Sequence, residues 1–164
     1  MLVSATKAVV LVGHGAVPTD CPPRLAAEFK RLEAEAKKSG PSPRFLEVDA
    51  ELRRWPRTEK TDPYKKGLED IAATLRRKLP ERVVLTAYNE FCAPTLEEAI
   101  ENAVGQGAKD IDVITTMFTR GGLHSEAEIP EIVKKESAKY PGVAIRYAWP
   151  FELDEVAKFL ATHL

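Results

Sequence analysis

The sequence predicts an α/β fold built on a four-stranded parallel sheet. The first observation is an apolar run, Ala8–Val12, that leads without a break into Gly13-His14-Gly15. A short continuous apolar run bounded by glycine is typical of a strand buried on both faces, as in parallel sheets. The second observation is that further apolar runs alternate with helical patterns, at residues 83–88, 111–118 and 143–148. Strands separated by helices imply right-handed crossovers and a parallel sheet.

The segment between the first two strands is expected to be mostly helical. Apolar residues at helical spacing predict a helix from Pro22-Pro23 to Ser39. Residues 44–54 suit either a short helix or extended chain, and the polar, basic residues 55–61 are expected to form a surface loop. Asp62-Pro63 has the residue types of an N-cap and a first helical position, so another helix is expected from there to Pro80.

The second half of the chain alternates strands and helices more regularly. Thr95 and Glu98 form a capping-box pattern at the start of the helix after the second strand. The segment Ser125–Glu128 imitates a second capping box, but Pro130 would then break the helix. We therefore expect this segment to be a turn, with Pro130 at the first position of a helix, and a closing helix over residues 153–164.

The composition is that of a single globular domain, placed at residues 1–164, with 44% hydrophobic and 30% charged residues. A formal charge of −1 gives no reason to expect nucleic acid or a membrane surface as a partner. No apolar run approaches the roughly 20 residues of a membrane span. The stretch Met1–Gly13 is expected to be strand and not signal peptide, and two cysteines do not make a disulfide framework. These features predict a cytoplasmic protein.

Ligand-type side chains follow three of the predicted strands. His14 and His124 lie in turns just past the first and third strands, and Glu90 lies just past the second. The carboxyl ends of parallel strands share one edge of the sheet, where ligands bind, so these side chains are expected to meet. Two imidazoles and a carboxylate suit a divalent ion such as Co²⁺, Ni²⁺ or Fe²⁺, and they also serve proton transfer. Taken alone, each of these three residues can also be interpreted as an ordinary turn residue or a solvated side chain.

Two other features bear on this edge. The fourth strand leads into Trp149-Pro150-Phe151, an apolar and aromatic rim suited to a flat ring. Cys92 lies close to Glu90, but a small packed thiol is the better interpretation of it than a metal ligand.

Three stretches, VGHGA, NEFCAPTLEEAIENAVGQGA and TTMFTRGGLHSEAEIPEIV, resemble the CbiX-type sirohydrochlorin cobaltochelatases, which are class II tetrapyrrole chelatases. The likeness covers the first strand and residues 83–164. It implies a Rossmann-like, chelatase-type three-layer sandwich. It also implies ATP-independent insertion of a divalent metal, with cobalt as the first expectation, into sirohydrochlorin or a related early tetrapyrrole. The implied pathway is biosynthesis of the cobalamin or sirohaem type. Short members of the family form homodimers that face each other across the tetrapyrrole, so a homodimer is expected.

By position, His14, Glu90 and His124 match the family's first histidine, its acidic residue and its second histidine. The resemblance therefore implies that these three bind the metal and carry the catalysis. The sequence departs from the family pattern in two places. Ala16 replaces a serine that is usual in the family, and a segment of approximately residues 44–80 is an insertion relative to shorter members. The chain has no G-x-x-x-x-G-K-[ST] phosphate loop, which favours a reaction without a nucleotide.

The insertion carries basic and aromatic residues in a small window: Arg53, Arg54, Trp55, Arg57 and Lys60. Arginine forks suit carboxylates and tryptophan stacks on flat rings, so this loop is either a lid over a polycarboxylate substrate or a solvated loop far from it. The predicted substrate contacts are Arg57, Arg120 and Trp149.

Two other functions compete with chelation. Gly-His-Gly after a strand is similar to the histidine phosphatases, but Gly13 occupies the place where those enzymes need an arginine. A non-catalytic carrier of tetrapyrrole or metal would use the same pocket, and the residues alone do not separate carrier from catalyst.

Overall fold

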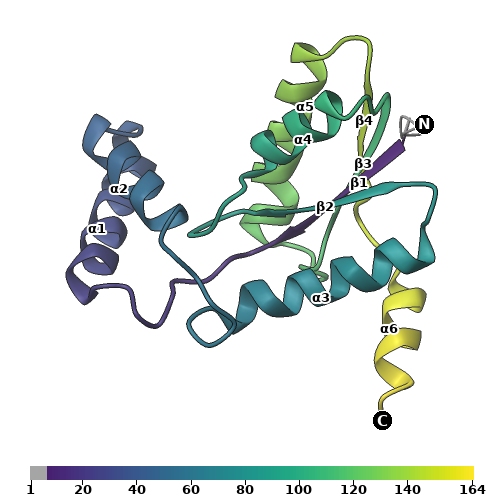
Figure 1. The fold of residues 1–164 in the computed structure, drawn as a ribbon, viewed down its shortest axis with the longest axis horizontal. Coiled ribbons are helices and arrows are strands. Elements are labelled where there is room, and N and C mark those ends of the chain that lie inside the picture. The colour runs from purple at the N-terminus through teal and green to yellow at the C-terminus, as the bar shows by residue number, and fades with distance from the viewer. Residues whose placement is uncertain (1–6) are drawn as a thin grey trace.

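The computed structural model describes residues 7–164 of the 164-residue chain, and the part of the predicted first strand in residues 1–6 lies outside the described residues. The elements alternate as an α/β protein does (Figure 1), in the order β1 (Lys7–Gly13), α1 (Pro23–Ser39), α2 (Pro43–Arg53), α3 (Pro63–Lys78), β2 (Val83–Tyr88), α4 (Leu96–Gly105), β3 (Asp110–Thr115), η1 (His124–Glu128), α5 (Ile129–Lys139), β4 (Ala144–Tyr147) and α6 (Leu153–Ala161).

The described strands form one parallel sheet in the order β2-β1-β3-β4. The central strand β1 has neighbours on both sides, with Val12 opposite Ala87 of β2 and Thr115 of β3. Because all pairings are parallel, the chain leaves β1, β2 and β3 at the same edge of the sheet. The predicted fold class is confirmed.

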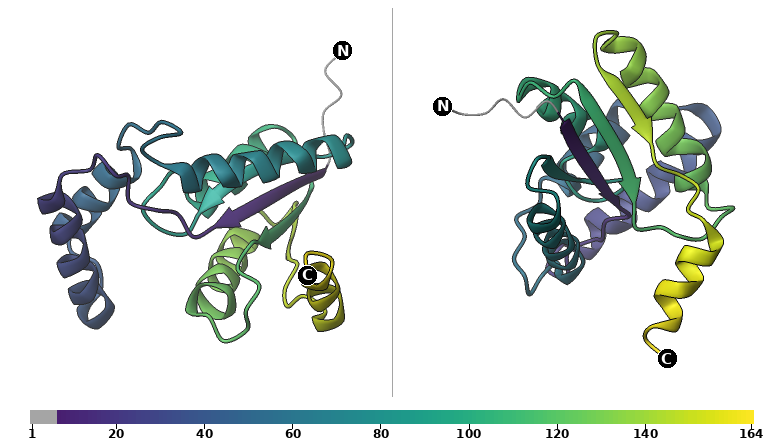
Figure 2. Two further views of the ribbon diagram at one scale, coloured as in Figure 1. Left: turned by 90° about the horizontal axis from the view of Figure 1, so that it is seen from below. Right: turned by 90° about the vertical axis from the view of Figure 1, so that its right-hand side faces the viewer.

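Helices cover both faces of this sheet, which makes three layers (Figure 2). Val9 and Leu11 of β1 face α3, where they pack with Leu68. The alternate residues of β1 face α4 and α5, where Val10 packs in one cluster with Ile100. Burial on both faces explains why β1 is apolar from Ala8 to Val12 and shows no alternation there.

The ambiguous segment 44–54 is helical, and α2 packs with α1 into a pair that stands at one end of the sheet (Figure 1). Ser42 caps α2 by accepting a hydrogen bond from the backbone N–H of Phe45 at 3.1 Å. The pair has a core of its own, built from Cys21, Leu25, Phe29, Leu32, Val48 and Leu52. The segment expected as an insertion therefore forms two parts of the fold, because α2 packs with α1 while α3 covers one face of the sheet.

Two predictions about the chain after β3 are wrong. The strand predicted over residues 111–118 ends at Thr115, whose hydroxyl donates to the carbonyl of Val12 at 3.0 Å and accepts from the N–H of Met117 at 3.1 Å. The carbonyl of Val12 also accepts the backbone N–H of Thr116 at 3.1 Å, and the strand pairing ends there. The turn predicted over residues 125–128 is a π-helical turn, η1, that runs directly into α5. Pro130 stands in the first turn of α5 as expected, and its ring would meet the carbonyl four residues earlier in a regular α-helix, so a wider turn accommodates it.

The closing helix α6 forms as predicted but projects from the side of the sheet that carries α5 (Figure 2). None of its residues is buried against the described part of the chain. No helix within residues 7–164 combines the length and the apolar character that a bilayer crossing requires.

The core between α4 and the sheet provides a test of this architecture. Ile100 is fully buried on α4, so Ile100→Ala should lower the free energy of unfolding by about 2–5 kcal/mol, through lost burial and a residual cavity. Ile71→Ala on α3 is the matched control, because that side chain is 48% exposed and should cost no more than about 0.5 kcal/mol. Urea denaturation of the two variants measures both values. Equal costs would contradict the packing described above.

Candidate metal centre

The three predicted ligand residues converge past the carboxyl ends of β1, β2 and β3. Ligand atoms from His14, Glu90 and His124 all lie within 4.8 Å of one another. The two imidazole rings are 5.0 Å apart between centroids, and each Nε2 lies 3.7 Å from a different carboxylate oxygen of Glu90. The expected meeting at one sheet edge is therefore what the structure shows, while the role of these groups as metal ligands stays a prediction.

The loops after β1 and β2 hold His14 against Glu90 by direct backbone contact. The N–H of Glu90 donates to the carbonyl of His14 at 2.8 Å, and the N–H of Asn89 donates to that of Gly13 at 2.9 Å. Gly15 has φ +97°, and a Cβ added there would lie 1.9 Å from the carbonyl oxygen of Glu90. Glycine is required at this position because the neighbouring loop occupies the space of a side chain.

The ring of His14 is oriented by its own loop. Its Nδ1 lies 2.9 Å from the carbonyl oxygen of Gly15, which can only accept a hydrogen bond. Nδ1 therefore carries the proton, and the lone pair of Nε2 faces Glu90. The backbone N–H of His14 also donates to the hydroxyl of Tyr64, on α3, at 2.7 Å.

His124 is oriented by two residues that the sequence interpretation did not place in the site. Its Nδ1 lies 2.6 Å from Glu128 Oε2, which can only accept a hydrogen bond, and 2.6 Å from the amide nitrogen of Asn89, which also donates to Glu128 Oε2 at 2.7 Å. Both histidines thus use Nδ1 for support and present Nε2 to the centre, an arrangement common in metal sites. The four-residue spacing of His124 and Glu128 would have indicated this pair only with the segment predicted as helical, because residues four apart share one face of a helix.

The two carboxylates of the site are shifted in opposite directions. Burial raises the pKa of Glu90, and the negative charge of Glu33 adds to this rise against the opposing effects of His124, His14 and Lys37. Burial would also raise the pKa of Glu128, but hydrogen bonds from His124 and Asn89 together outweigh it and lower that pKa. Glu128 therefore keeps its charge at lower pH than Glu90 does.

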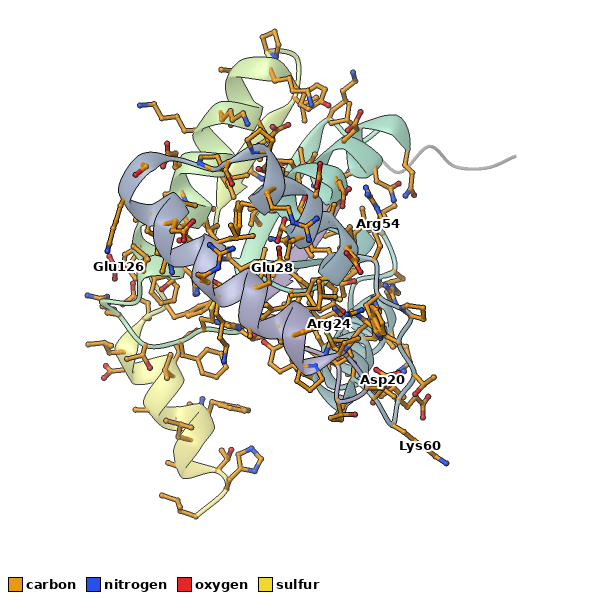
Figure 3. The ribbon with its side chains drawn as sticks, turned by 90° about the vertical axis from the view of Figure 1, so that its left-hand side faces the viewer. Asp20, Arg24, Glu28, Arg54, Lys60 and Glu126 are labelled. Carbon is orange, nitrogen blue, oxygen red and sulfur yellow. The ribbon has the colours of Figure 1, made fainter. Side chains whose placement is uncertain are left out.

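Helix α1 walls this centre on one side and was not predicted to do so. A cavity of about 310 Å³ lies between Phe29, Glu33 and Lys37 of α1 and the site residues Asn89, Glu90 and Glu128. Figure 3 shows α1, with Arg24 and Glu28 labelled on it, crossing this end of the molecule. The side chains of Glu90 and His124 are 18% and 20% exposed, and that of His14 is 41% exposed. The centre is thus sheltered but open to small solutes.

The structure corrects the prediction that Arg57 contacts the substrate. Its side chain is only 6% exposed and is paired with the buried carboxylate of Asp62. Its guanidinium also donates to backbone carbonyls, at 2.8 Å to Ala16 and 3.0 Å to Leu52. A guanidinium held in this way by its own chain is not available to a carboxylate of a ligand.

The other two predicted substrate contacts lie at the surface of the same edge. Arg120 is exposed in the loop between β3 and η1. Trp149 is half-buried, stacked on Tyr147 at 6.2 Å and set edge-on to Phe151 at 5.3 Å. Phe151 also packs edge-on against Phe118 at 5.9 Å, so the expected aromatic rim exists. Cys92 is 1% exposed and packs with α3 and the sheet, as expected of a packed thiol.

Sequence comparison finds a family model, CbiX, that matches residues 59–161, a range that contains Glu90 and His124 but not His14. The sirohydrochlorin ferrochelatase of Priestia megaterium is 29% identical over 94 residues, covering 56% of this chain and 35% of that protein. The sirohydrochlorin cobaltochelatase of Methanococcoides burtonii is 36% identical over 73 residues, covering 44% of this chain and 55% of that protein. The matches thus span between about a third and just over half of the length of these curated relatives.

Solved structures give the same likeness at the level of fold. The sirohydrochlorin chelatase SirB from Bacillus subtilis subspecies spizizenii, in complex with cobalt, aligns with a TM-score of 0.51 at 23% identity, over 96% of this chain and 49% of that one. A CbiX protein of cobalamin (vitamin B12) biosynthesis from Marinobacter aquaeolei VT8 aligns with a TM-score of 0.56 at 16% identity, over 96% and 92%.

The electrostatics of the centre predict how binding of a divalent ion depends on pH. A divalent ion bound here would compete with protons for the Glu90 carboxylate, whose raised pKa makes it take up a proton earlier than an ordinary glutamate as the pH falls. Affinity for Co²⁺ should therefore fall as the pH is lowered from 8 to 5, because protonation of the Glu90 carboxylate removes a negative charge from the centre. Calorimetric titration at several pH values measures this. An affinity that stays constant from pH 8 to pH 5 would exclude these ligands.

Proposed function

Since the chain belongs to the CbiX family, we propose that it is a chelatase that inserts a divalent metal ion into sirohydrochlorin or a related early tetrapyrrole. The observation that carries the proposal is the cluster of His14, Glu90 and His124, with both Nε2 atoms directed at one carboxylate. The metal is a substrate in this reaction, as is the macrocycle. We propose cobalt as the metal, with iron and nickel as alternatives. The relatives are named for cobalt and for iron, and the ligand set also suits nickel.

The reaction exchanges one divalent ion for the two protons on the pyrrole nitrogens of the free macrocycle. In the proposed mechanism the neutral imidazoles of His14 and His124 hold the ion through Nε2 and release it to the macrocycle. Glu90 lies between them and balances the charge of the ion. As the ion leaves, the Glu90 carboxylate accepts one pyrrole proton, a step that its raised pKa favours, and an imidazole Nε2 that the ion has left accepts the other. No nucleotide takes part.

The macrocycle is proposed to lie at the open edge of the sheet, between the metal cluster and the aromatic rim. Trp149 and Phe151 offer flat apolar faces to the ring, and the exposed guanidinium of Arg120 can reach the carboxylates at its periphery. These contacts are proposals drawn from the chemistry of the side chains.

We further propose that two copies of the chain pair through α6. Its nine residues leave Leu153, Phe159 and Leu160 between 53% and 64% exposed, and Phe118 beside them is 46% exposed. An isolated helix shorter than about 12 residues is marginal in water, so covering the apolar face of α6 with a partner surface would stabilise it. A second copy would cover this apolar face and enclose the macrocycle from the opposite side.

Removal of either histidine tests the chelatase proposal. His14→Ala and His124→Ala should each lower the rate of Co²⁺ insertion into sirohydrochlorin by at least about 100-fold, because each variant removes one of the three proposed ligands of the ion. Glu101→Gln, on the exposed face of α4, is the control and should keep the wild-type rate. Absorbance of the macrocycle measures the rate, with circular dichroism to check folding.

The same assay separates catalyst from carrier and ranks the metals. A chelatase converts many macrocycles per chain with Co²⁺, Ni²⁺ or Fe²⁺, whereas a carrier takes up one equivalent and stops. Wild-type turnover in either histidine variant would contradict the assignment of the cluster.

A substitution on α6 tests the pairing. Phe159→Glu places a charge in the proposed interface, so this variant should sediment as a monomer at concentrations where the wild type sediments as a dimer. Leu46→Glu is the matched control, because Leu46 is similarly exposed, at 55%, but lies on α2. Analytical ultracentrifugation distinguishes the outcomes. A monomeric wild type, or a dimer unaffected by Phe159→Glu, would rule out pairing through α6.

A further inference from the structure

The helix pair α1–α2 and the sheet are separate packing units that meet at the metal centre. The pair has its own apolar core, and Phe91, in the loop after β2, packs against it. The ring of Phe91 lies 5.3 Å from Phe29 of α1 and 5.9 Å from the imidazole of His14. The geometry of the centre therefore depends on how this junction is held together.

Arg53, at the end of α2, binds the backbone of the loop that carries Glu90. Its side chain is 16% exposed, and its Nε donates to Asp49 at 2.8 Å. The two terminal nitrogens donate to the carbonyls of Asn89 and Cys92, each at 3.0 Å. The acceptors stand on either side of Glu90, so this one guanidinium fixes both ends of the segment that presents the carboxylate.

Arg57 joins that loop to the one that carries His14. One terminal nitrogen donates to the carbonyl of Ala16, two residues after His14, at 2.8 Å. The other donates to the carbonyl of Phe91, the residue after Glu90. Phe91 has φ +61°, which is a strained backbone conformation for a residue with a side chain. Such a conformation persists only where the surrounding structure holds it.

We propose that Arg53 and Arg57 are positioning residues that hold the Glu90 loop in the conformation in which it contacts the His14 loop, and so tune the affinity of the centre for its metal ion. The inference rests on the proposed function, because it assigns the cluster to a metal. The role differs from that of a substrate lid, which was one interpretation of the basic residues 53–60, because the side chains of Arg53 and Arg57 point into the protein. Four carbonyls of the site loops, from Ala16, Asn89, Phe91 and Cys92, depend on them.

The guanidinium shape matters more than the charge in this arrangement. A planar fork presents donors in several fixed directions at once, whereas a lysine ammonium on a flexible stem cannot reach the same set of acceptors. Lysine variants therefore keep the buried positive charge beside Asp49 or Asp62 but release some of the loop carbonyls. Misplacing the support of a ligand commonly costs about 10- to 100-fold in metal affinity.

The experiment compares Arg53→Lys and Arg57→Lys with Arg54→Lys in the full chain. Arg54 is the matched control, because it lies between the other two, is 71% exposed and has only a 3.8 Å ion pair with Glu98. Co²⁺ affinity is measured by calorimetry, the visible Co²⁺ spectrum reports the ligand arrangement, and thermal unfolding reports stability. We expect Arg53→Lys and Arg57→Lys to lose about 10- to 100-fold in affinity with an altered spectrum, and Arg54→Lys to match the wild type.

The outcomes separate this inference from the proposed function. If the wild type fails to bind Co²⁺, the metal centre itself is wrong. If the wild type binds and the folded Arg53→Lys and Arg57→Lys variants bind equally well with the same spectrum, the positioning role is wrong. A loss of the same size in Arg54→Lys would also overturn it, by pointing to general charge. Should Arg57→Lys fail to fold, Arg53→Lys, at the less buried position, decides the question.

Discussion

The approach of two loop backbones at Gly15 and Glu90 is the constraint on which the candidate site depends. The parallel register places Gly13 opposite Tyr88, so the chain leaves β1 and β2 side by side. Hydrogen bonds between the two loops then continue past the strand ends, and only a glycine leaves room for the carbonyl of Glu90. His14 and Glu90 face each other because their backbones already touch.

The strands and their meeting edge were predictable because the responsible signals are local and strong. A strand segment buried on both faces is apolar throughout, as β1 is from Ala8 to Val12, and helices between strands leave a parallel sheet as the expected arrangement. Parallel strands bring their carboxyl ends together whatever the sequence distance, so His14, Glu90 and His124 were expected to converge. The same reasoning could not show that α1 walls the site, since a helix pattern reports which residues are apolar and not where the helix docks.

The direction of a charged side chain is the part that the sequence leaves open. Arg57 stands in a window with Arg54 and Lys60, and all three look alike as residues of a polar loop. Yet Arg57 is buried against Asp62 while Arg54 is 71% exposed. The difference arises from carbonyl acceptors contributed by distant loops. The π turn at His124 escaped prediction for a related reason: turn and capping rules were weighed locally, whereas the bond to Glu128 becomes visible only once the segment is helical.

The openness of the centre fits the proposed reaction, in which the ion must leave the protein. Structural metal sites usually close four ligands around the ion, and their affinity opposes release. Here the described residues bring together two imidazoles and one carboxylate, and the His14 side chain is 41% exposed. In the proposed reaction, coordination positions would therefore remain for the nitrogens of an incoming macrocycle, which would replace the protein ligands one at a time. A site with rigid support behind its ligands and solvent in front of them can hold an ion in place and still release it.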